Sequence, residues 1–198
     1  MAMIDNLNWR CFIALEEELV NTQNFVEIHK SNYKTFSIKY RSIIMQACSE
    51  IEIIYKKVCG IDHANKADMK TYRDFIKNNH HQDFFNIEVL IPIYNEKLKP
   101  WFVCAEDRSP EFWSAYNTIK HQGKLEEATL ENAISSLADL FSLLLLWYFK
   151  SHGREFSGNE AISLPKLFNY PGLSPTFIVT EDSHNIKIPG FEAVKELA

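Results

Sequence analysis

Two long segments of this 198-residue chain repeat apolar side chains at intervals of three and four residues, and this periodicity constrains the fold more than any other feature. In the first segment, residues 37–59, the repeating positions are Ile43, Ile44, Ala47, Ile51, Ile54, Tyr55 and Val58. In the second, which follows Thr129 and ends before Gly153, they are Leu130, Ala133, Ile134, Leu137, Phe141, Leu144, Leu145 and Tyr148. Such spacing draws one apolar stripe along an α-helix, so both segments are predicted to be core helices of a bundle.

Start and stop signals predict further helices around residues 9–20, over residues 69–78 after the capping residue Asp68, and from Ser109-Pro110-Glu111 to a stop at Gly123. Gly60 is the expected stop of the first long helix. Apolar alternation predicts extended pieces at residues 24–28 and 84–94. In the tail, T-F-I-V-T and N-I-K-I flank a turn near Asp182–Asn185 and indicate a small hairpin. The expected fold is therefore mainly α, a helical bundle with short extended or β-hairpin additions at its N- and C-terminal ends.

No repeat and no linker divides the sequence, so residues 1–198 are expected to form a single domain with an appendage over residues 157–198. The net charge of −5 gives no bulk signal for a surface that grips long nucleic acid. The four cysteines lack a C-x-x-C pair, and no signal peptide opens the chain, which favours free thiols in the cytoplasm. The apolar run at residues 137–149 is interrupted by Asp139 and is shorter than a membrane span, so no membrane contact is expected.

Three polar residues near the end of the helix that follows Pro110 are the strongest candidate site: Asn117, Lys120 and His121. Positions i, i+3 and i+4 share one side of a helix. Histidine exchanges protons near neutral pH, an ammonium offsets charge on a phosphate, and an amide can orient either group, which suffices for metal-free RNA cleavage through the 2′-hydroxyl. The alternative is that Lys120 and His121 only complement the helix dipole while Asn117 faces water.

Other chemical signals in the sequence are weaker. Glu50 falls beside the apolar stripe of the first long helix, where a carboxylate needs a partner or water, and it is a candidate supporting residue for the site. His80-His81-x-Asp83 has ligand chemistry but no accompanying third cluster, so no metal is expected. No Walker loop, G-x-G-x-x-G or G-x-S-x-G occurs, and no cofactor is expected.

The order of several motifs resembles the HEPN superfamily (higher eukaryotes and prokaryotes nucleotide-binding domains), in particular a bacterial branch of it. The resemblance spans residues 36–149 and rests on F-S-I-K-Y-R-S-I-I-M-Q-A-C-S-E-I-E at 36–52, K-P-W at 99–101, W-S-A-Y-N-T-I-K-H at 113–121 and A-T-L-E-N-A-I-S-S-L-A-D-L-F at 128–141. It implies an α-helical bundle that dimerises, with the motif helix facing its symmetry mate. Many members are metal-independent endoribonucleases that act as toxins or antiviral effectors.

The signature of those ribonucleases is an arginine, a polar residue, a short spacer and a histidine. Asn117 matches the polar residue and His121 matches the histidine, whereas Tyr116 stands at the arginine position and, like Glu50, is a candidate supporting residue of the site. The guanidinium that would bind the scissile phosphate is therefore missing, and Lys120 could replace it only as a point charge.

Two readings of function remain open from the sequence. In the first, a dimer binds or cleaves RNA in a toxin, stress or phage-defence setting, with His121 transferring the proton, Lys120 offsetting the phosphate charge and Asn117 orienting. In the second, the same residues hold a protein partner or a small nucleotide without catalysis. The missing arginine and the negative net charge favour the second reading.

Overall fold

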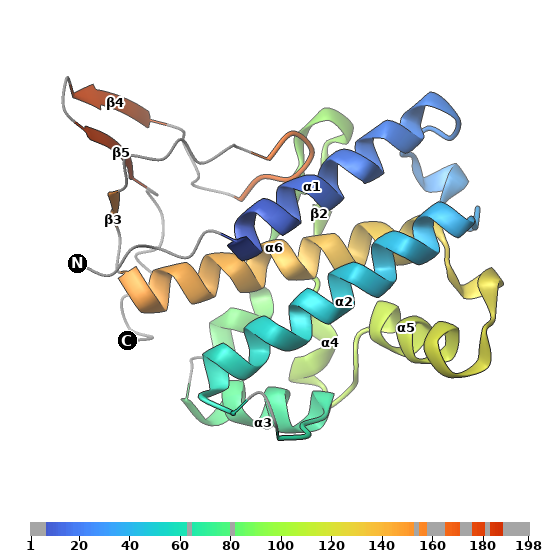
Figure 1. Ribbon diagram of the computed structural model, residues 1–198, viewed down its shortest axis with the longest axis horizontal. Helices are drawn as coiled ribbons and strands as arrows, with labels where there is room; N and C mark the ends of the chain where they lie inside the picture. The colour runs from blue at the N-terminus through green and yellow to red at the C-terminus, as the bar shows by residue number, and fades with distance from the viewer. Residues whose placement is uncertain are drawn as a thin grey trace.

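The computed structural model of the chain describes residues 7–62, 65–79, 82–152, 155–157, 165–170, 176–180 and 183–187. Its helices form one bundle, with α6 running through the middle (Figure 1). The α-helices are α1 (Leu7–Asn21), α2 (Ile38–Cys59), α3 (Met69–Asn79), α4 (Phe102–Ala105), α5 (Glu111–Gln122) and α6 (Leu130–His152). Short 3-10 helices are η1 (Thr22–Asn24), η2 (Lys30–Asn32), η3 (Gln82–Asn86), η4 (Pro92–Tyr94) and η5 (Leu125–Glu127). The fold is mainly α, as the sequence predicted.

The two long helices predicted from apolar periodicity are α2 and α6, and they form the most extensive helix pair of the bundle. The hydroxyl of Ser37 accepts a hydrogen bond from the Tyr40 N–H at 3.0 Å and so begins α2. Gly60 ends α2 in the left-handed region at φ 65°, where a residue without Cβ is favoured. The Thr129 hydroxyl accepts from the Asn132 N–H at 3.2 Å at the start of α6.

The remaining helices pack on this pair. Helix α1 contacts both α2 and α6 on one side, α5 contacts both on another, and α3 packs on α2. The stacked rings of Tyr55 and Tyr72, 4.5 Å apart, join α2 to α3. Helix α6 is long and apolar enough to span a membrane, yet 78% of its window from Leu130 to Trp147 is buried inside the protein. Its apolar surface is therefore used in the core, as the sequence predicted.

Residues 84–94 were predicted to be extended, and only the middle of this range, residues 89–91, forms a strand. Residues Gln82–Asn86 form η3, and the strand β1 (Val89–Ile91) pairs antiparallel with β2 (Glu96–Leu98), which the sequence did not indicate. Pro92 lies outside the strand and opens η4 in the hairpin connection, because proline has no N–H for a ladder. The prediction of a strand at residues 24–28 is wrong: the Phe25 and Val26 N–H groups both bond to the Thr22 carbonyl oxygen, so the chain turns there.

A three-stranded sheet follows α6, in the order β3 (Glu155–Ser157), β5 (Ser183–Lys187), β4 (Thr176–Thr180). The β4–β5 pair is the expected hairpin, with Thr180 opposite Ser183 at its closed end. Strand β3 was not predicted. The expected helix stop at Gly153 lies outside the described residues.

One carboxyl group is sealed inside the bundle. Asp139 of α6 is fully buried, and neither of its side-chain oxygens has a hydrogen-bond partner. The buried thiols of Cys48 and Cys104 and the Tyr55 phenol lie within electrostatic range of it. Burial raises the pKa of Asp139 well above its usual range, so the uncharged acid is the favoured form in the core.

Asp139→Asn is expected to raise the free energy of unfolding at pH 7. In the native protein the raised pKa keeps a proton on Asp139 that the unfolded chain releases above about pH 4. This contribution to stability is complete below the unfolded pKa and is lost as pH rises, by up to about 1.4 kcal/mol per pH unit for one proton. Urea denaturation under reducing conditions measures the free energy of unfolding from pH 4 to 8. The wild type should lose stability with rising pH more steeply than the variant. An equal dependence on pH in the two proteins would contradict the prediction.

Candidate functional site

Helix α5 carries all three residues of the predicted site, and its two ends are fixed in different ways. Its N-cap is Pro110, in an extended conformation and without a side-chain cap, so the prediction that Ser109 caps this helix is wrong. The Pro110 carbonyl accepts from the Ser114 N–H at 3.3 Å and starts the helical ladder. At the other end Gly123 adopts φ 69° and donates its N–H to the Ile119 carbonyl at 3.1 Å, which confirms the predicted stop.

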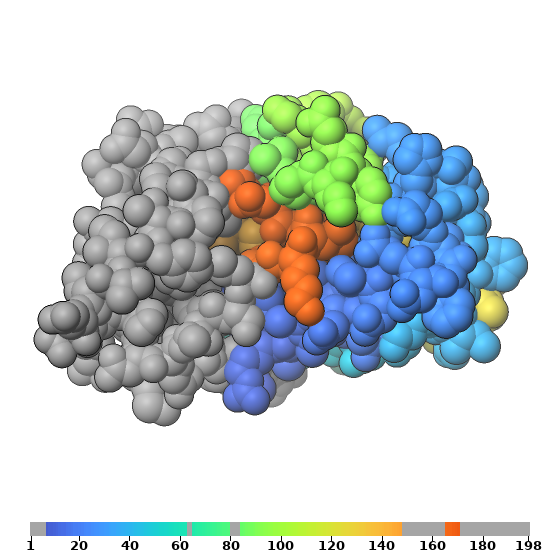
Figure 2. Space-filling view, turned by 90° about the horizontal axis from the view of Figure 1, so that it is seen from above, coloured from blue at the N-terminus to red at the C-terminus, as the bar shows by residue number. Residues whose placement is uncertain are grey.

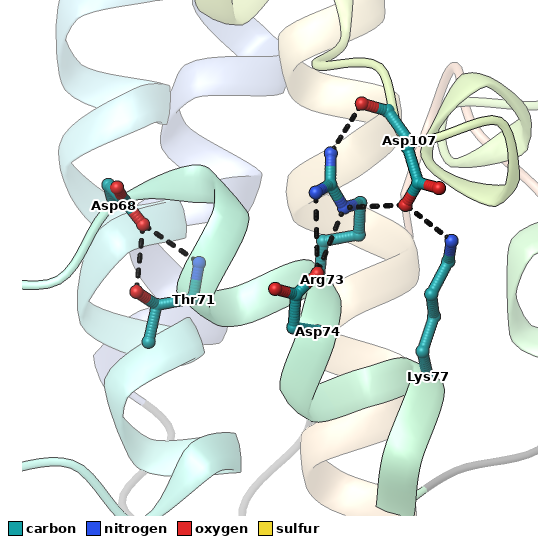
Figure 3. Close-up of polar contacts among 6 residues, drawn as sticks. All are labelled: Asp68, Thr71, Arg73, Asp74, Lys77 and Asp107. Atoms are coloured by element: carbon teal, nitrogen blue, oxygen red, sulfur yellow. Dashed lines mark hydrogen bonds and ion pairs between the residues drawn. The ribbon is translucent and has the colours of Figure 1, made fainter.

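The loop before α5 is clamped to α3 by a charge cluster (Figure 3). Arg73 of α3, only 8% exposed, donates from Nη1 to the Asp107 carbonyl at 2.6 Å, and its Nε lies 3.4 Å from the Asp107 carboxylate. Lys77, one turn further along α3, donates to the same carboxylate at 2.6 Å and lowers the pKa of Asp107. Asp107 has a left-handed backbone at φ 61°, uncommon for a residue with a side chain. These contacts therefore fix the turn that precedes α5 against α3.

Helical geometry separates the three predicted site residues. At about 100° per residue, Lys120 lies about 40° around the axis from Tyr116, Asn117 about 100° and His121 about 140°. Tyr116 is 5% exposed and packs into the core, Asn117 is half-buried, and Lys120 and His121 are exposed. The three polar side chains thus lie at different angles on one side of α5. His121 is the furthest around the axis from Tyr116, which faces the core.

Lys120 leans back along α5 onto Tyr116. Its Nζ donates to the Tyr116 hydroxyl at 3.1 Å and lies 5.1 Å from the centre of the ring, which is itself packed against Trp113. The hydrogen bond to Tyr116, the charge interaction with the same residue and the field of Glu52 in α2 raise the pKa of Lys120. The site therefore offers a charged ammonium that Tyr116 holds in place through its hydroxyl and its ring.

The side chains of His121 and Asn117 make no hydrogen bond to any residue that the structure describes. Both ring nitrogens of His121 are therefore free of contacts to the described residues and can bind a ligand or solvent. This arrangement can exchange a proton with a bound molecule and place a cation beside it.

Glu50 was expected to support the site on α5, but its hydrogen-bond partner lies on α1. Its carboxylate accepts from Asn8 Nδ2 of α1 at 2.8 Å, and the Asn8 Oδ1 accepts from Lys57 at 2.7 Å. The partner that a carboxylate beside the apolar stripe requires is therefore on α1. Glu52 lies about 200° around α2 from Glu50, and it is the carboxylate whose field reaches Lys120.

Metal and thiol chemistry find little support among the described residues. No group of three or more His, Cys, Asp or Glu residues there has the geometry to hold a metal ion. The four cysteines form no disulfide; Cys48, Cys59 and Cys104 are buried and Cys11 is half-buried. Burial raises the pKa of Cys104 to about 12, which suppresses its nucleophilic thiolate. His80 and His81 lie outside the described residues.

Comparison of this chain with family models, curated proteins and solved structures finds no match.

Tyr116→Phe is expected to lower the pKa of Lys120 toward the ordinary lysine value. The Tyr116 hydroxyl is the largest cause of the raised pKa, and phenylalanine keeps the ring while removing this acceptor. NMR titration of the lysine ε-methylene signals measures the change, and Lys124, two residues beyond α5, is the internal control. An unchanged Lys120 titration would contradict the contact.

Proposed function

We propose that this protein is a HEPN-like dimer that binds RNA at the last turn of α5 and cleaves it without a metal, in a cytoplasmic toxin, stress or phage-defence setting. The observation that carries the proposal is the exposed imidazole of His121, which makes no hydrogen bond to any described residue, together with the nearby Lys120 ammonium that hydrogen-bonds to Tyr116. The motif order of residues 113–121 supplies the RNA assignment, and the free imidazole supports it.

Cleavage of RNA by its own 2′-hydroxyl requires two proton transfers and an offset of charge. A base removes the 2′-hydroxyl proton, the oxygen attacks the adjacent phosphorus, and the bond to the 5′-oxygen breaks as an acid protonates that oxygen. The products are a 2′,3′-cyclic phosphate and a 5′-hydroxyl. In the proposed mechanism His121 acts in proton transfer, Lys120 offsets charge on the phosphate and Asn117 orients the imidazole or a phosphate oxygen.

Dimerisation completes this set of groups. Each α5 contributes one imidazole, at His121, while the reaction needs both a base and an acid. In the proposed dimer the exposed sides of two α5 helices face each other, so one His121 serves as base and its counterpart as acid. Lys120 remains a point charge and lacks the forked donors of arginine, so weaker phosphate binding is expected than in relatives of the superfamily that keep the arginine.

His121→Ala is expected to abolish cleavage of RNA and to leave the fold intact, because the exposed imidazole makes no internal hydrogen bond among the described residues. Gln122→Ala is the matched control, since this exposed neighbour shares the turn but none of the proposed chemistry. Cleavage of labelled single-stranded RNAs in the presence of EDTA, with end-group analysis for the cyclic phosphate, measures the activity. Retained cleavage in His121→Ala, or none in the wild type, would refute the catalytic assignment.

The second candidate is a non-catalytic module that holds a protein partner or a small nucleotide at the same surface. The tyrosine at the expected arginine position favours it, because Lys120 is a single point charge and lacks the forked donors that bind a scissile phosphate. RNA or nucleotide binding without cleavage, reduced in a Lys120→Gln variant, would select this candidate. Binding of a nucleotide to the native state would raise the thermal midpoint.

A further inference from the structure

The core of the bundle contains side-chain oxygens that have no partner among the described residues. Asp139 of α6 and Tyr55 of α2 are both 0% exposed. The two carboxyl oxygens and the phenol oxygen make no hydrogen bond to any residue that the structure describes. On the face shown in Figure 2, the atoms of the gold helix α6 are visible only between the blue, green and orange segments that cover it. Bulk solvent therefore does not reach these three oxygens.

A series of contacts places Tyr55 beside the turn of α6 that carries Asp139. The Tyr55 ring meets the Trp101 ring edge-on, with the ring centres 5.2 Å apart. The Trp101 indole N–H donates to the Ser142 hydroxyl at 2.7 Å, and the Ser142 hydroxyl donates to the Asp139 carbonyl oxygen at 2.9 Å. The Asp139 carboxyl group also lies within electrostatic range of the Tyr55 phenol. The carboxyl group and the phenol are thus neighbours in the core.

The polar side chains around this pair have no hydrogen left to donate to it. Trp101 carries one N–H and Ser142 one O–H, and both are already used in the hydrogen bonds above. The thiols of Cys48 and Cys104 lie within electrostatic range of Asp139, but a thiol is a weak donor. A polar group without a partner in an apolar core destabilises the folded state. A small molecule that both donates and accepts hydrogen bonds would offset this cost.

We propose that Asp139 and Tyr55 together bind an internal water molecule in the core, where α2, α4 and α6 meet. Water has two donors and two acceptors, so one molecule can bond to both side chains. Globular proteins hold about one buried water per 27 residues, bound to polar groups that would otherwise be unsatisfied. Internal spaces that stay empty have apolar linings, whereas carboxyl, phenol and thiol groups meet here. The proposal is independent of any activity toward RNA.

The uncharged form of Asp139 fits this role. Burial raises the pKa of Asp139 well above its usual range, so the carboxyl group keeps a proton that it can donate to the water. The water in turn donates to the Tyr55 phenol oxygen. These hydrogen bonds join α6 to α2, and they supplement the apolar contacts of the same pair of helices.

A crystal structure of the wild-type protein below neutral pH, at a resolution that shows ordered water, tests the site directly. Electron density for a water is expected within hydrogen-bond distance of an Asp139 carboxyl oxygen and of the Tyr55 phenol oxygen. A direct hydrogen bond between the two side chains, or no density between them, would overturn the proposal.

A double-mutant cycle tests the same coupling in solution. Tyr55→Phe removes the phenol oxygen and should lower the urea midpoint of the wild type, because the water loses a partner. In an Asp139→Leu background the same substitution should leave the midpoint unchanged or raise it. The larger apolar leucine there takes the place of the water and leaves the phenol without a partner. Equal effects of Tyr55→Phe in the two backgrounds contradict the proposed water.

Tyr72→Phe is the matched control for this cycle. Tyr72 is also 0% exposed, its hydroxyl has no partner among the described residues, and its ring stacks on Tyr55. Burial raises the pKa of Tyr72, and the carboxylates that add to this effect are Glu52 and Asp68. Tyr72→Phe should therefore shift the midpoint equally in both backgrounds, and a dependence on Asp139 as large as that of Tyr55→Phe would also refute the site. If the Asp139→Leu protein does not fold, the wild-type crystal structure decides.

Discussion

The packing of α2 against α6 is the interaction on which the other elements depend. Both helices bury a continuous apolar stripe, and α1 and α5 each contact both members of the pair. Apolar burial on this scale offsets the cost of burying the uncharged acid Asp139 in α6. The α5 surface is attached to this pair of helices.

The α5 surface differs from a conventional buried active site. Tyr116 belongs to the core and holds Lys120, whereas His121 points away from the core by the geometry of the helix. One cation is therefore positioned by the fold and one imidazole is left free. Such an open surface gains a water-excluding wall only when another molecule covers it, and the proposed RNA-bound dimer would provide that cover.

Local sequence signals predicted the helices well where periodicity and capping agreed. Ser37, Gly60 and Thr129 act through groups within four residues, so their effects on α2 and α6 can be predicted without tertiary structure. The strand predicted at residues 24–28 failed because the Thr22 carbonyl captured two following N–H groups. The hydrogen bond from Lys120 to Tyr116 joins residues four apart on one helix and was within reach of sequence reasoning, which assigned Tyr116 only a general supporting role.

The sequence by itself determined the mainly α class, the C-terminal ends of α2 and α5 and the placement of Asn117, Lys120 and His121 on one side of a helix. These properties depend on groups a few residues apart, and helix periodicity fixes their relation. Only the tertiary structure decided that Glu50 meets Asn8, that Arg73 clamps Asp107 and that Glu16 binds three N–H groups about 150 residues away. Each of these contacts joins segments whose relative position is set by core packing, and no local pattern encodes it.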